Sequence, residues 1–170
     1  MRRHYCYVGS PEIAHLPADP RYRYRVEAAA DVERWAWETQ QVRSSAQAIT
    51  ATFIINGEEQ LWIADRHSEH IACADGQPVL AAGEITFHWD CSGISVTEVT
   101  NQSTGYCPEP DSWDVVAAVL QRLNLAHPTA FTTCFLFRRC IHCGTTNIVK
   151  DSWWECAACQ APLSPIWNYD

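Results

Sequence analysis

The sequence predicts an α+β fold, in which an antiparallel sheet with two helices is followed by a small C-terminal zinc ribbon. Three observations predict it. Two segments carry apolar residues at helical spacing, and a separate run of β-rich segments is joined in pairs by turn sequences. The third observation is the pattern CxxC-x12-CxxC near the C-terminus. We expect an α+β domain over residues 1–137 and the ribbon over residues 138–170.

The composition excludes several classes of protein. At 170 residues and 47% hydrophobic content, the chain can bury one ordinary core. Twelve basic and twenty acidic side chains give a formal net charge of -8, which disfavours binding to nucleic acid and to anionic membranes. No apolar run reaches the ~18–20 residues of a membrane span. Nine cysteines without a disulfide framework indicate a reducing compartment. We therefore expect a cytoplasmic protein, and the oligomeric state stays open.

The first helix is expected over residues 32–45. Asp31 is a suitable N-cap, because its side chain can accept the unpaired N–H groups of the first turn. Val32, Trp35 and Val42 recur at the spacing of one helical face. This face is expected to pack against the sheet.

The sheet is expected to be an antiparallel meander of two hairpins. Asn56-Gly57 between two apolar runs is the strongest short-range hairpin signal, and residues 90–93 supply the second turn. The expected strands are residues 48–56, 60–65, 79–89 and 94–101, with shorter strands at residues 5–8 and 130–137.

The second helix is expected to begin at Asp111 or Ser112 and to end near Leu125. Asp114 in its first turn is favourable beside the positive end of the helix dipole. An apolar stripe indicates the face that turns toward the core. The residues of this stripe are Val115, Val116, Val119, Leu120 and Leu123.

The C-terminal cysteine pairs are expected to hold one structural Zn²⁺. Two residues between paired cysteines let both sulfurs reach one ion, and four cysteines leave no open position for catalysis. Gly144 follows the first pair, where the turn needs a positive φ. Residues 146–149 and 153–155 are expected to pair as a hairpin. The expected ligands are Cys140, Cys143, Cys156 and Cys159.

Two loops carry a high density of polar and reactive side chains. We call residues 65–73 the first loop and residues 101–110 the second loop. Both follow expected strands, so hairpin geometry can bring them together. The leading hypothesis is a non-enzymatic adaptor or immunity-type protein that presents these loops to a protein partner, which the acidic charge would steer if it is basic. The expected binding residues are Arg66, His67, Ser68, Asn101, Gln102, Ser103 and Tyr106.

Two alternatives stay open. The first is an enzyme in which a histidine activates a cysteine and Asn101 or Gln102 donates to an oxyanion. Its candidates are Cys107 and Cys73 as nucleophile, His67 and His70 as base, and Glu69 or Asp65 as the group that orients the imidazole. The second alternative is a nucleic-acid-binding ribbon that uses Arg138 and Arg139. The net charge disfavours it, and these arginines can instead offset the negative charge of a metal bound by four thiolates.

Part of the chain resembles a known module. His67-Ser68, Gly76, residues 79–85, Gly93 and residues 101–108 resemble a module of plant IQ-motif calmodulin-binding proteins and of bacterial toxin-associated proteins. The resemblance covers residues 66–125 and implies a shared β-rich scaffold with a polar loop cluster. It does not imply an activity, because the calmodulin motif and a histidine of the module are missing. The whole chain resembles a widespread, uncharacterised bacterial family with a C-terminal zinc ribbon.

Overall fold

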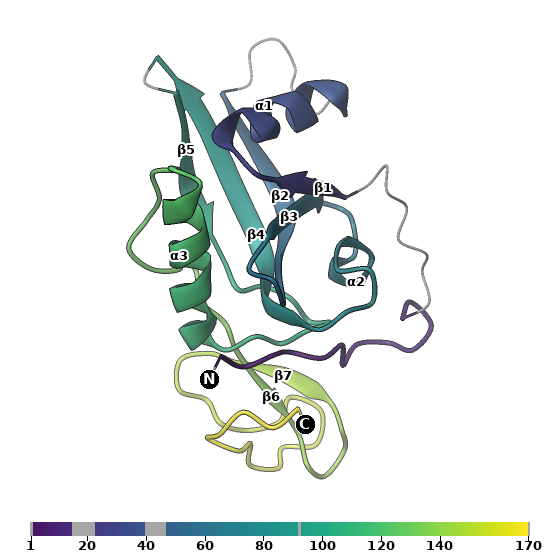
Figure 1. Cartoon of the computed structure of the whole chain (residues 1–170). Helices are drawn as coiled ribbons and strands as arrows, with labels where there is room; N and C mark the ends of the chain where they lie inside the picture. Colours follow the sequence, from purple (N-terminus) through teal and green to yellow (C-terminus); the bar gives the residue numbers. More distant parts are fainter. Residues whose placement is uncertain (1, 15–22, 40–46, 92, 170) are drawn as a thin grey trace.

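The computed structural model describes residues 2–14, 23–39, 47–91 and 93–169 (Figure 1). It confirms the α+β class, with an antiparallel sheet and a C-terminal group of four cysteines. No helix in the described ranges is long and apolar enough to span a bilayer. The elements are β1 (Tyr24–Val26), α1 (Ala29–Glu38), β2 (Ala48–Asn56), β3 (Leu61–Asp65), α2 (His70–Cys73), β4 (Val79–Asp90), β5 (Gly93–Val99), the 3-10 helix η1 (Pro110–Ser112), α3 (Trp113–Arg122), β6 (Leu136–Arg139) and β7 (Thr146–Val149).

Strands β1 to β5 form one sheet in the order β1-β3-β2-β4-β5, and every neighbouring pair is antiparallel. Both expected hairpins are present. In a simple meander β3 would pair with β4. Here β4 pairs with β2 instead, and β1 pairs with the free edge of β3. β2 is buried on both faces from Ala51 to Ile55, which suits a central strand that is paired on both edges.

Each face of the sheet carries its own hydrophobic core. Helices α1 and α3 pack on one face, where Trp35 and Leu120 meet alternate residues of β2 such as Phe53. The opposite face packs against α2, the N-terminal segment and the C-terminal residues, with Ile54 and Trp167 in the same cluster. Because side chains alternate along a strand, β2 contributes to both cores.

Helix α1 begins earlier than the sequence predicts. Ala28 is the N-cap, and Asp31 lies one turn inside the helix. The Asp31 carboxylate reaches back to accept the N–H groups of Glu27 and Ala28 at 2.8 and 2.9 Å. The expected N-cap was therefore wrong, although the same carboxylate satisfies the helix start. The end of the predicted helix, residues 40–45 with Val42, lies outside the described residues.

The turn between β2 and β3 depends on Asn56 rather than on Gly57. The Asn56 side-chain oxygen accepts the N–H groups of Glu58 and Gln60 at 3.1 and 2.8 Å. Glu59, at φ 59°, takes the left-handed conformation. The hairpin was predicted correctly, and the asparagine side chain stabilises its turn, which runs to Gln60.

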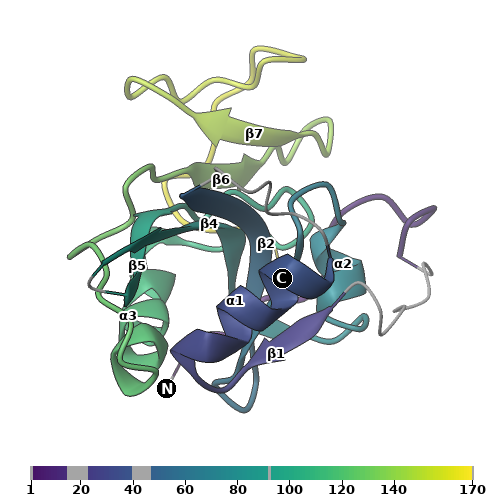
Figure 2. The same ribbon diagram turned by 90° about the horizontal axis from the view of Figure 1, so that it is seen from above.

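The ribbon lies at the opposite end of the molecule from α1 (Figures 1 and 2). Its strand β7 was predicted with the correct bounds, but β7 pairs with β6 and not with residues 153–155. Residues 153–155 instead pair with the segment that follows Cys159, through an antiparallel bridge between Glu155 and Pro162. The strand expected at residues 5–8 is reduced to one bridge between Tyr5 and Val79.

Candidate functional site

The two cysteine pairs of the ribbon lie in turns of the same geometry. In the first, Gly144 N–H donates to the Cys140 carbonyl at 2.9 Å, and Cys140 N–H donates to Thr145 at 2.9 Å. In the second, Gln160 N–H donates to the Cys156 carbonyl at 2.9 Å. Gly144 and Gln160 both have positive φ, at 76° and 64°. The conformation predicted from Gly144 is thus confirmed, and Gln160 adopts it as well.

These turns bring the four sulfurs to one point. All four Sγ atoms lie within 4.8 Å of one another, a group that can hold a metal ion. The Sγ atoms of Cys140 and Cys159 are 3.5 Å apart, as are those of Cys143 and Cys156. Hydrogen bonds from the backbone N–H groups of the second turn lower the pKa of the Cys156 thiol, which favours the thiolate that a metal requires.

Asn147 of β7 fixes the second turn of the four-cysteine group. Its side-chain oxygen accepts the Ala157 N–H at 2.9 Å, and its amide donates to the Thr145 carbonyl at 2.8 Å. One buried side chain therefore joins both turns. Asn147 was not predicted from the sequence, although an asparagine beside the apolar pair Ile148-Val149 was a signal.

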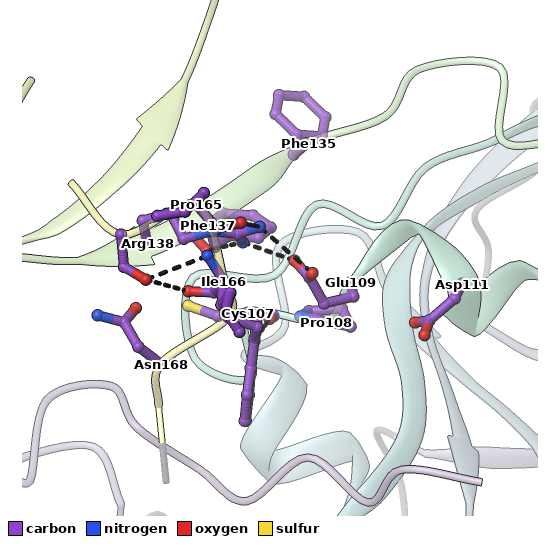
Figure 3. Close-up of polar contacts among 12 residues, drawn as sticks. Cys107, Pro108, Glu109, Asp111, Phe135, Phe137, Arg138, Pro165, Ile166 and Asn168 are labelled. Carbon is purple, nitrogen blue, oxygen red and sulfur yellow. Dashed lines mark hydrogen bonds and ion pairs between the residues drawn. The ribbon is translucent and has the colours of Figure 1, made fainter. Parts of the chain in front are cut away.

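Arg138 lies inside the junction between ribbon and sheet (Figure 3). Its side chain is 4% exposed and pairs with Glu109 of the second loop at 2.7 Å. The same guanidinium donates to the Pro165 carbonyl at 3.1 Å. Arg138 is therefore not available for the nucleic acid that the second alternative assigns to Arg138 and Arg139, because it is buried and paired with Glu109.

Two asparagine amides attach β6 to the rest of the protein. Asn101 accepts the Phe135 N–H at 2.7 Å and donates to the Phe135 carbonyl at 2.8 Å. Asn168 makes the same pair of bonds with Arg139, at 2.9 and 2.7 Å. Each amide thereby replaces a backbone partner that a neighbouring strand would supply. Asn168 was not predicted from the sequence, because only long-range contacts give it a role.

The two polar loops meet at a pocket. A cavity of about 220 Å³ lies between them and extends to Thr52 of β2 and Glu84 of β4. Within it, Arg66 is 3.8 Å from Glu84, while the Thr52 hydroxyl holds the first loop by donating to the Ser68 carbonyl at 3.2 Å. The lining residues are Thr52, Arg66, His67, Ser68, Glu69, His70, Glu84, Gln102 and Thr104.

Three of the expected binding residues are in the interior. Asn101, Ser103 and Tyr106 are at most 1% exposed. Tyr106 donates its hydroxyl hydrogen to the Gln77 carbonyl at 2.9 Å, and Asn101 is occupied at β6. This is a correction to their expected role, because buried side chains cannot contact a partner. Arg66, His67, Ser68 and Gln102 remain at the pocket.

The structure does not assemble the expected Cys-His pair among the described residues. Burial raises the pKa of Cys73 to about 12 and that of Cys107 to about 11. The Cys107 thiol donates to the Thr104 carbonyl at 3.4 Å, whereas His70 Nε2 lies 3.0 Å from the Gly83 carbonyl. Neither cysteine is therefore an activated nucleophile, and Asn101 has no free donor for an oxyanion. The expectations for these groups, and for His67 and Glu69 as their helpers, are corrected accordingly.

No family model, curated protein or solved structure matches this chain. The resemblance drawn from residues 66–125 therefore stays a prediction.

Proposed function

We propose that this protein is a zinc-stabilised cytoplasmic binding protein, of adaptor or immunity type, that engages a protein partner through the pocket between the two loops. The proposal rests on one observation: residues of both loops line the same polar cavity. Polar groups that face a concavity at loop ends are typical of recognition sites.

The identity of the metal follows from ligand chemistry. Four thiolates suit zinc or iron, and a closed tetrahedral set without a free position suits a structural ion. The cluster beside the cysteines contains few apolar side chains, chiefly Val149 and Leu163. So small a core needs the metal to fold, because its hydrophobic burial alone cannot offset chain entropy.

A binding role is favoured over an enzymatic one because the pocket holds no activated nucleophile. The raised pKa values keep Cys73 and Cys107 as neutral thiols at neutral pH. A basic partner is favoured because the net charge of -8 steers cationic surfaces toward the protein. A reducing location is supported by the absence of disulfides among the nine cysteines.

Elemental analysis combined with visible absorption tests the metal. About one equivalent of zinc and a colourless protein are expected, whereas a coloured iron centre would contradict the assignment. Replacing Cys156 by serine is expected to lower the metal content below about half an equivalent and to unfold the ribbon. Cys91, which is exposed and far from the metal in sequence, gives the matched Cys91→Ser control.

Quantitative affinity capture with paired variants tests the partner. Arg66→Ala and Gln102→Ala alter the two sides of the pocket, and Glu98→Gln on β5 is the control outside it. A protein bound in stoichiometric amount by the wild type and by Glu98→Gln, but lost from both pocket variants, is expected. Retention of the partner by both pocket variants would contradict the assignment, as would preferential capture of nucleic acid.

A further inference from the structure

We infer that metal binding in the ribbon controls the shape of the second loop, and through it one side of the polar pocket. This inference rests on the proposed function only in taking the pocket as the binding site. The coupling itself follows from the contacts of the C-terminal segment, residues 165–169, which we call the tail.

The tail begins where the metal centre ends. After the second cysteine pair, Cys156 N–H donates to the Ala161 carbonyl at 2.8 Å and Leu163 N–H donates to the Trp154 carbonyl at 2.9 Å. Leu163 is buried in the same cluster as Cys140 and Cys156. The path of the chain into the tail is therefore fixed by the folded metal centre.

The tail in turn holds the second loop. Trp167 is buried, and its indole N–H donates to the Cys107 carbonyl at 2.8 Å. Arg138 joins the two segments, because it pairs with Glu109 and donates to the Pro165 carbonyl (Figure 3). The second loop is thus held by a buried ion pair and a buried hydrogen bond that both involve the ribbon or its tail.

Cys107 is the point at which this support matters most. It has φ 46°, a left-handed conformation that is unfavourable for a residue with a side chain and persists only when surrounding contacts impose it. Its N–H donates to the Ser103 carbonyl at 2.7 Å, and its thiol donates to Thr104. Thr104 lines the pocket. Release of Trp167 would let Cys107 relax, which would shift the second-loop wall.

The first loop is anchored mainly to the sheet. Its backbone is held by Thr52 of β2, and Cys73, in α2 at its end, packs in a cluster with Ile54 and Ala64 of the sheet that also includes Trp167. Loss of the metal is therefore expected to open the second loop while the first loop keeps its conformation. A pocket with one fixed wall and one metal-dependent wall binds its partner only when the ribbon is loaded.

Site-resolved alkylation tests the coupling without any partner. The purified protein is treated with iodoacetamide before and after removal of the metal by a chelator, and each cysteine is quantified by mass spectrometry. Cys107, which is 0% exposed, is expected to react about tenfold faster or more in the metal-free protein. Cys73, which is 1% exposed, is expected to stay protected. Continued protection of Cys107 in metal-free protein overturns the inference, and so does equal exposure of Cys73, which indicates global unfolding.

A second variant probes the tail with the metal in place. Trp167→Phe keeps an aromatic ring but removes the indole N–H that Cys107 accepts. We expect full metal content and a several-fold faster alkylation of Cys107. Trp153→Phe, at a side chain that is 66% exposed, is the control and is expected to leave the rate unchanged. Because no partner enters these measurements, the coupling and the proposed function can fail independently.

Discussion

The two loops that line the pocket differ in how they relate to the fold. Arg66, His67 and Glu69 of the first loop are exposed, and Thr52 holds this loop through the Arg66 carbonyl. In the second loop, Asn101 and Tyr106 are buried and hydrogen-bonded to distant segments. Polar residues in a loop can thus face a partner or satisfy the protein's own backbone. The difference is decided by long-range contacts and not by the composition of the loop.

The largest effect is expected where the second loop crosses the sheet. A Cβ atom on Gly83 would lie 1.9 Å from the Thr100 carbonyl oxygen, so Gly83→Ala must displace backbone. We expect the free energy of unfolding to fall by about 3 kcal/mol or more, measured by urea denaturation. Gly57→Ala is the matched control, because its nearest contact is at 3.6 Å and belongs to a side chain. Equal losses in the two variants would contradict the close crossing.

A loss of about 3 kcal/mol is expected for Glu109→Gln. The change leaves the Arg138 charge buried without its carboxylate, and breaking a buried pair in this way is costly. The value is at the low end of that range because Glu109 is 17% exposed. Glu69→Gln in the first loop should change stability by less than about 0.5 kcal/mol. If Glu69→Gln lowers the free energy of unfolding as much as Glu109→Gln does, the two loops do not differ in how they support the fold.

Asn101→Ala is expected to cost about 2 kcal/mol. It removes the partner of the Phe135 N–H and the donor to two carbonyls, and unmade buried hydrogen bonds carry their full desolvation penalty. Gln102→Ala, at the exposed neighbouring position, should be close to neutral. Denaturation curves of both variants at saturating metal measure the difference, and a neutral Asn101→Ala would refute the role assigned to the amide.

The smallest effect concerns pH and the first loop. Burial lowers the pKa of His70, so the unfolded chain binds more protons than the folded protein below the unfolded pKa of about 6.5. Stability should therefore be complete above that pH and decline as the pH falls toward the lowered pKa. Thermal melts of His70→Gln should lose this decline, whereas melts of the exposed His67→Gln variant should keep it.

The sequence was a good guide to local structure and a poor one to the contacts between distant segments. The bounds of β2 and β7 and the conformation of Gly144 follow from apolar runs, turn residues and cysteine spacing. The pairing of β7 with β6 and the burial of Arg138 do not, because both depend on the final packing of ribbon against sheet. The same reason explains why polar residues of the second loop were read as exposed.

The amides of Asn101 and Asn168 have a consequence for self-association. They occupy the backbone groups of Phe135 and Arg139, and the Phe137 carbonyl between them accepts the Arg138 guanidinium at 2.6 Å. Every second residue along a strand directs its backbone N–H and C=O groups to the same edge of the strand. Most backbone groups on that side of β6 are therefore already paired, so we expect a feature that joins two parts of one molecule also to disfavour the addition of a strand from another chain.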